Sequence, residues 1–60
     1  MSNKSCVAIG QTESGVMEVM TPHDEQESKK DAQRRATDAV QKQGYKKAFV
    51  AQVLFEVNTP

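Results

Sequence analysis

The segment from Ala48 to Val57 (AFVAQVLFEV) most constrains the fold, because as a β-strand it is apolar on both faces. Its odd positions place Phe49, Ala51, Val53, Phe55 and Val57 on one side, and its even positions place Val50 and Leu54 on the other. A sheet that contains this strand needs a cover on each face. We expect a single helix to supply one cover, so the other face must meet a partner, a second copy or water.

The chain has 60 residues, which predicts one domain that buries only about 60% of the surface of its unfolded form. Small folds are usually reinforced by disulfides, a metal or oligomerisation. Cys6 is the only cysteine, and His23 is the only other soft metal ligand, whereas a structural zinc site needs four ligands. We therefore predict no metal and no cofactor, and we expect a homo-oligomer, with a dimer favoured.

The compartment is predicted from the same features. A lone cysteine and a start (MSNKSCVAIG) that does not resemble a signal peptide favour a reducing compartment. No apolar run approaches the roughly 18 to 20 residues that cross a bilayer. We expect a soluble, cytoplasmic protein without membrane contact.

The hydrophobic pattern predicts strands at about residues 5–11, 16–20 and 48–57 and a helix at about 29–43. Gly15 supplies the positive φ of the hairpin turn, and Gly44 suits the position just past the helix. The helix start is open between residues 21 and 29. Thr21 with Pro22 offers one cap, and Ser28 followed by Asp31 offers the other, which we prefer.

This order predicts an α+β fold of ββαβ type, with a three-stranded antiparallel sheet of order 2-1-3 and the helix on one face. We expect the helix to cover the face with the larger side chains, namely Val7, Ile9, Met17, Val19, Phe49, Ala51, Val53 and Phe55. The opposite face would then present Cys6, Ala8, Val16, Met20, Val50 and Leu54. The last strand is an edge, and a long apolar edge is a template for pairing with another chain.

No residue set in the chain predicts catalysis. His23 has no nucleophile tied to it by the sequence, and Cys6 lacks a predicted helix N-terminus that would activate its thiol. The acidic cluster at residues 24–27 has neither the spacing of a calcium loop nor that of a paired acid/base site, and no phosphate-binding glycine motif is present. We predict that the protein is not an enzyme.

Charge is divided along the chain although the formal net charge is zero. Residues 1–28 are mainly acidic, and residues 29–47 carry seven of the eight basic side chains. Asp38 is spaced to pair with Lys42 on a helix. The basic cluster has two interpretations, a soluble helix exterior with weak ion pairs or a footprint for nucleic acid or an acidic protein surface.

Two resemblances follow from these segments. The run Ser28-Lys29-Lys30-Asp31-Ala32 resembles the helix start of a double-stranded-RNA-binding domain, which implies phosphate contacts for Lys29 and Lys30. The chain lacks that family's first helix and third preceding strand. The whole pattern, including KKDAQRRATDAVQKQGYKKAFVAQVLFEV, is similar to small phage and mobile-element proteins, including anti-CRISPR proteins. That likeness implies a binder that blocks or redirects a host protein.

Together these patterns predict a small non-enzymatic binding protein that self-associates and docks on a macromolecular partner. The predicted contact residues are Met20, Val50 and Leu54, and the predicted electrostatic contacts are Arg34, Arg35, Lys46 and Lys47. The alternative is a nucleic-acid-binding protein that uses the basic helix face.

Overall fold

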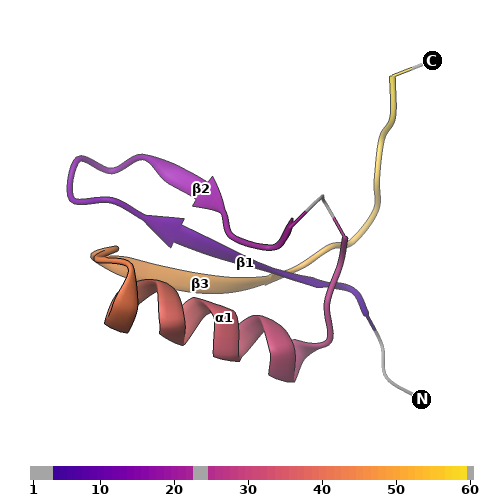
Figure 1. Cartoon of the computed structure of the whole chain (residues 1–60). Coiled ribbons are helices and arrows are strands. Elements are labelled where there is room, and N and C mark those ends of the chain that lie inside the picture. Colours follow the sequence, from indigo (N-terminus) through magenta and orange to yellow (C-terminus); the bar gives the residue numbers. More distant parts are fainter. Residues whose placement is uncertain (1–3, 23–24, 60) are drawn as a thin grey trace.

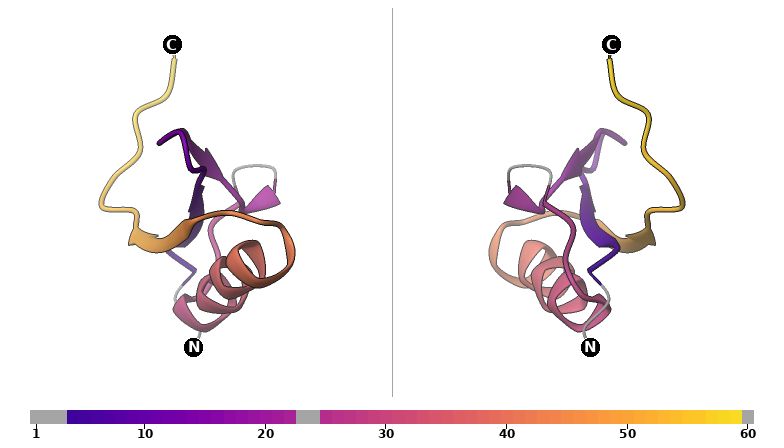
Figure 2. Two further views of the ribbon diagram at one scale, coloured as in Figure 1. Left: turned by 90° about the vertical axis from the view of Figure 1, so that its left-hand side faces the viewer. Right: turned by 90° about the vertical axis from the view of Figure 1, so that its right-hand side faces the viewer.

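The computed structural model describes residues 4–22 and 25–59. It contains four elements, shown in Figure 1: β1 (Cys6–Gln11), β2 (Met17–Val19), α1 (Lys29–Lys42) and β3 (Lys47–Gln52). The strands form one antiparallel sheet of order β2-β1-β3, and α1 packs on one side of it (Figure 2). The predicted ββαβ fold and its strand order are confirmed.

The central strand β1 has hydrogen-bonding neighbours on both sides. It pairs with β3 along its whole length and with β2 from Ile9 to Gln11. Beyond β2, the chain continues along the same side of β1, where Met20 N–H donates to the Ala8 carbonyl (2.8 Å) and Ala8 N–H donates to Thr21 Oγ1 (2.9 Å). The chain then returns at Glu27, which exchanges two backbone hydrogen bonds with Cys6 (2.8 and 2.7 Å).

Helix α1 begins at the later of the two predicted positions. Ser28 is the N-cap, and its side chain accepts a hydrogen bond from Asp31 N–H (3.2 Å). At the other end, Gly44 has a φ of 81°, as predicted for the residue that follows a helix. Gly15 likewise has a φ of 95° in the β1–β2 connection. Ala32, Ala36 and Ala39 are the buried residues of the helix.

The predicted assignment of the covered face is wrong. The buried cluster joins Cys6 and Ala8 of β1 to Ala32 and Ala36 of α1, with Met20, Ala48 and Val50 packed against it. The helix therefore covers the even-numbered face of the sheet, which carries the smaller side chains. The inward surface of α1 consists of alanines, and small side chains on both sides allow the helix and sheet backbones to approach closely.

The strand predicted to reach Val57 ends at Gln52. Because β1 begins at Cys6, the pairing runs out there, and Val53 N–H donates to the Ser5 carbonyl (2.7 Å) just beyond it. Residues 53–59 leave the sheet and extend away from α1, as both Figure 1 and Figure 2 show. Leu54, Phe55 and Val57 are exposed to 84, 79 and 82%.

Candidate functional site

The first candidate site is the sheet face opposite α1, which we call the open face: Val7, Ile9, Met17, Val19, Phe49 and Ala51. The strand registers set Val19, Ile9 and Phe49 in one row across all three strands. Val19 is 58% exposed and Phe49 is 41% exposed. The next row pairs Val7 with Ala51, and Lys47 stands opposite Gln11 at the start of β3.

The open face carries larger apolar side chains than the buried core on the other side of the sheet. No large side chain in the described part of the chain is fully buried, and the buried hydrophobic residues are four alanines and one cysteine. The chain exposes 4874 Å², roughly 1,000 Å² more than the approximately 3,900 Å² that a compact monomer of this mass exposes. Residues 53–59 contribute to this exposed area, since Leu54, Phe55 and Val57 are among the most exposed apolar side chains of the described residues.

The three predicted contact residues do not lie on one surface. Met20 and Val50 are partly buried beneath α1, because they lie on the covered face. Their predicted place on an uncovered face is therefore corrected. Leu54 remains exposed, but it lies beyond the end of β3 and not on the sheet.

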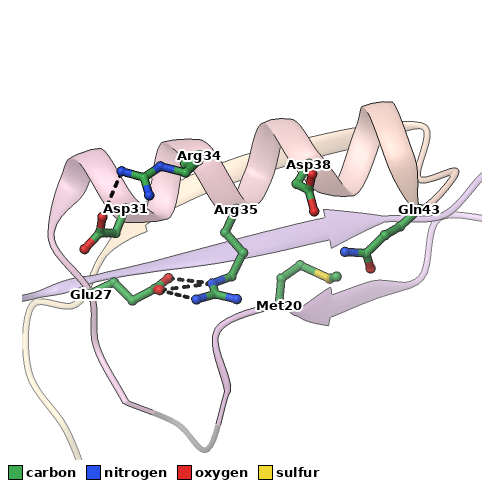
Figure 3. A pocket seen from close by; sticks show the side chains of 7 residues that line it. All are labelled: Met20, Glu27, Asp31, Arg34, Arg35, Asp38 and Gln43. Carbon is green, nitrogen blue, oxygen red and sulfur yellow. Dashed lines mark hydrogen bonds and ion pairs between the residues drawn. The ribbon is translucent and has the colours of Figure 1, made fainter.

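The second candidate site is a shallow groove between α1 and the chain segment that leaves β2, shown in Figure 3. Its lining mixes carboxylates and guanidinium groups around one methionine: Met20, Glu27, Asp31, Arg34, Arg35, Asp38 and Gln43. The charged groups of the groove are largely engaged with one another, as the dashed contacts in Figure 3 show. The groove is therefore a polar contact region that links α1 to the sheet.

Glu27 and Arg35 form the central ion pair of this groove. Arg35 Nη2 donates to Glu27 Oε1 at 2.7 Å, and Arg35 Nε donates to both carboxylate oxygens at 3.0 Å. Thr21 Oγ1 donates to Glu27 Oε2 (3.1 Å) and accepts from Ala8, so the network runs from helix to central strand. The hydrogen bonds from Arg35 lower the pKa of Glu27, and the same contact raises the pKa of Arg35.

The predicted electrostatic residues do not gather in one patch. Arg35 is held by Glu27, and Arg34 lies 3.5 Å from Asp31. The predicted pair of Asp38 and Lys42 is confirmed at 3.5 Å. Lys46 and Lys47 are exposed at the start of β3. His23, predicted to be an ordinary turn residue, lies outside the described residues.

Tyr45 is a structural residue that the sequence reasoning did not place. Its hydroxyl donates to the Glu18 carboxylate, which raises the Tyr45 pKa. Its ring lies over Gly10, where an added Cβ would come within 2.9 Å of the ring and 3.1 Å of the Met20 sulfur. The glycine at position 10 therefore permits the ring to cross β1 and reach β2.

The described residues hold no group of three or more His, Cys, Asp or Glu side chains arranged to bind a metal ion. Cys6 is buried in the core at 8% exposure. Among the described residues, no helix combines the length and the apolar character needed to span a membrane.

Comparison with known proteins adds no relative. No protein-family model, no curated protein and no solved structure matches the chain.

Proposed function

We propose that this chain is a non-enzymatic binding protein that docks on an apolar surface of another protein through its open face. The observation that carries the proposal is the placement of Ile9, Val19 and Phe49 on the side of the sheet that α1 does not cover.

The chemistry of the surface favours a protein partner over a nucleic acid. The centre of the open face is aliphatic and aromatic, which suits the core of a protein interface. Phosphate binding depends on available cations, whereas Arg34, Arg35 and Lys42 each lie within salt-bridge distance of a carboxylate. The likeness to small phage proteins extends the proposal: the partner is a host protein whose activity the docked chain modulates.

The test uses charge placed on each surface separately. A partner is captured with the wild-type chain, purified, and titrated by calorimetry at low and moderate salt. We expect Val19→Asp to weaken binding at least tenfold, or about 1.4 kcal/mol, because it places a carboxylate in an apolar interface. Arg34→Glu, on a side chain that is 75% exposed, is the matched control and should change affinity less than about twofold.

The alternative outcome is equally specific. Binding through phosphates falls steeply between low and moderate salt and depends on Arg34 and its neighbours. If duplex RNA or DNA binds with that salt dependence, and if Arg34→Glu removes binding while Val19→Asp does not, then docking through the open face is wrong.

A further inference from the structure

The outer edge of β3 is a second surface of the sheet, distinct from the open face. The order β2-β1-β3 leaves one side of β3 without a neighbouring strand among the described residues. An apolar edge strand without proline is a template for another strand. The chain then continues beyond Gln52 as Val-Leu-Phe-Glu-Val, a segment of high β-propensity that is largely exposed.

The hydrogen bonds to β1 determine which residues face this edge. In an antiparallel pair, successive residues alternately direct their N–H and C=O groups to one side and to the other. Val53 N–H donates to Ser5, so Val53, Ala51 and Phe49 are directed toward β1. Ala48, Val50 and Gln52 therefore direct their backbone groups to the outer edge.

We propose that two copies of the chain pair antiparallel through this edge, with residues 53–57 extending each strand. Only even-numbered residues have outward backbone groups, so they must pair with even-numbered residues of the second copy. The register that uses all of 47–57 sets Gln52 opposite Gln52 of the partner subunit. It also sets Phe49 opposite Phe55 of the partner subunit, and Val50 opposite Leu54 of the partner subunit, which form apolar cross-strand pairs.

This pairing places both helices on the same side of a continuous six-stranded sheet. Each α1 contacts β1 and β3 about equally, so it sits over the space between them. The two copies meet at Gln52, close to the N-terminal end of α1, so the helices are offset along the strands and do not pack side by side. The flank of α1 toward β3 carries a shallow apolar hollow lined by Ala36, Thr37, Val40, Gln41 and Ala48. In this register residues 53–57 of the second copy run beside Ala48 and Val50, so Leu54 and Glu56 of the partner subunit lie nearest to Val40, which is 41% exposed in one copy.

Charge is complementary along the same edge. Glu56 is the one acidic residue of the segment 53–57, and in this register it arrives beside Ala48 of the partner subunit. That end of β3 carries Lys46 and Lys47, which are both exposed. The two-fold symmetry forms this contact twice, and it favours the antiparallel arrangement.

The first test is the solution mass over a concentration series, measured by sedimentation equilibrium. The wild type should have twice the protomer mass of 6.6 kDa. Gln52→Pro should give a folded monomer, because the N–H of Gln52 is not used by β1 and proline is tolerated on an edge. Gln52→Val keeps the N–H and should remain a dimer. Circular dichroism of each variant separates loss of pairing from loss of the fold.

The second test checks the register and the contact at Val40. In a Cys6→Ala background, Gln52→Cys should cross-link to its own copy on oxidation, because a hydrogen-bonded pair has Cα atoms about 5.5 Å apart. Phe49→Cys alone should not cross-link, since its opposite residue is at position 55. Val40→Glu should raise the dissociation constant of the dimer at least tenfold, because it places a carboxylate beside Leu54 and Glu56 of the partner subunit, whereas Arg34→Glu, on the other flank of α1, should not.

A wild type that stays monomeric at all concentrations, or a dimer that survives Gln52→Pro, would overturn this pairing. Cross-linking at position 49 in place of 52 would overturn the register. Val19→Asp should leave the mass unchanged, because Val19 lies on β2, at the opposite side of the sheet from the edge of β3. Failure of this pairing is therefore distinguishable from failure of the proposed docking function.

Discussion

Ile9 and Phe49 stand directly opposite each other across β1 and β3, on the side of the sheet that α1 leaves open. On the other side, Ala8 is fully buried beneath the helix. The sheet thus turns its smaller side chains inward and its larger ones outward. In a chain that works alone, the larger apolar groups would be the ones to bury.

The free energy of unfolding should therefore depend strongly on side-chain size on the covered face and only weakly on the open face. Ala36→Leu inserts three carbons between α1 and the sheet and should reduce the free energy of unfolding by about 1–3 kcal/mol. Val19→Thr, on a residue that is 58% exposed, should change it by less than about 1 kcal/mol. Urea denaturation measures both. Equal losses for the two variants would contradict the assignment of the faces.

Gly10 should not tolerate a side chain. A Cβ at this position would lie 2.9 Å from the Tyr45 ring, so Gly10→Ala should destabilise the fold by about 1–3 kcal/mol. A double-mutant cycle with Tyr45→Ala isolates the cause, because the alanine at position 10 should cost much less once the ring is gone. An unchanged cost in the double variant would show that the ring is not the obstacle.

The Glu27–Arg35 contact should make stability depend on acid pH. Arg35 lowers the pKa of Glu27 in the folded state, so this contribution is complete above the unfolded pKa of about 4.3 and is lost as the pH falls through the folded value. At pH 7, Glu27→Gln should lower the free energy of unfolding by about 1–2 kcal/mol, because one partner is partly exposed.

The difference between wild type and Glu27→Gln should shrink toward zero in acid. Glu13→Gln, in the exposed β1–β2 connection, is the matched control and should change stability by less than about 0.5 kcal/mol at either pH. A Glu27→Gln difference that persists unchanged at pH 2 would mean that the carboxylate charge is not its source.

Tyr45 offers a spectroscopic test of its contact with Glu18. The chain has one tyrosine and no tryptophan, so tyrosinate absorbance reports this residue alone. The hydrogen bond to Glu18 raises the Tyr45 pKa, so the absorbance transition should occur above pH 10. The stabilisation that this hydrogen bond provides should be lost as the pH rises through that transition. Glu18→Gln should lower the midpoint. An identical midpoint in both proteins would exclude the contact in solution.

Local signals in the sequence predict much of this fold. The Ser28 cap, the positive φ of Gly15 and Gly44, and the strand order follow from residue chemistry and chain direction. Even the grouping of Ile9, Val19 and Phe49 on one face was predictable from strand alternation. Each of these depends on near neighbours or on simple geometry.

The remainder depends on contacts between distant segments. Hydrophobicity alone assigns the helix to the larger side chains, but the alanine surface of α1 fits the small ones. The end of β3 depends on where β1 begins, which the apolar run of residues 48–57 does not reveal. The ion pair between Glu27 and Arg35 forms only because the backbone of Glu27 pairs with Cys6. No local pattern at residues 21–28 predicts that pairing.

The most direct test of this account is a set of nuclear Overhauser contacts from the methyl groups of Ala32 and Ala36. We predict contacts from these methyl groups to Ala8 and Val50, and none to Ile9 or Phe49. Contacts from Ala36 to Ile9 or Phe49 would show that the helix covers the other face and would contradict the central claim.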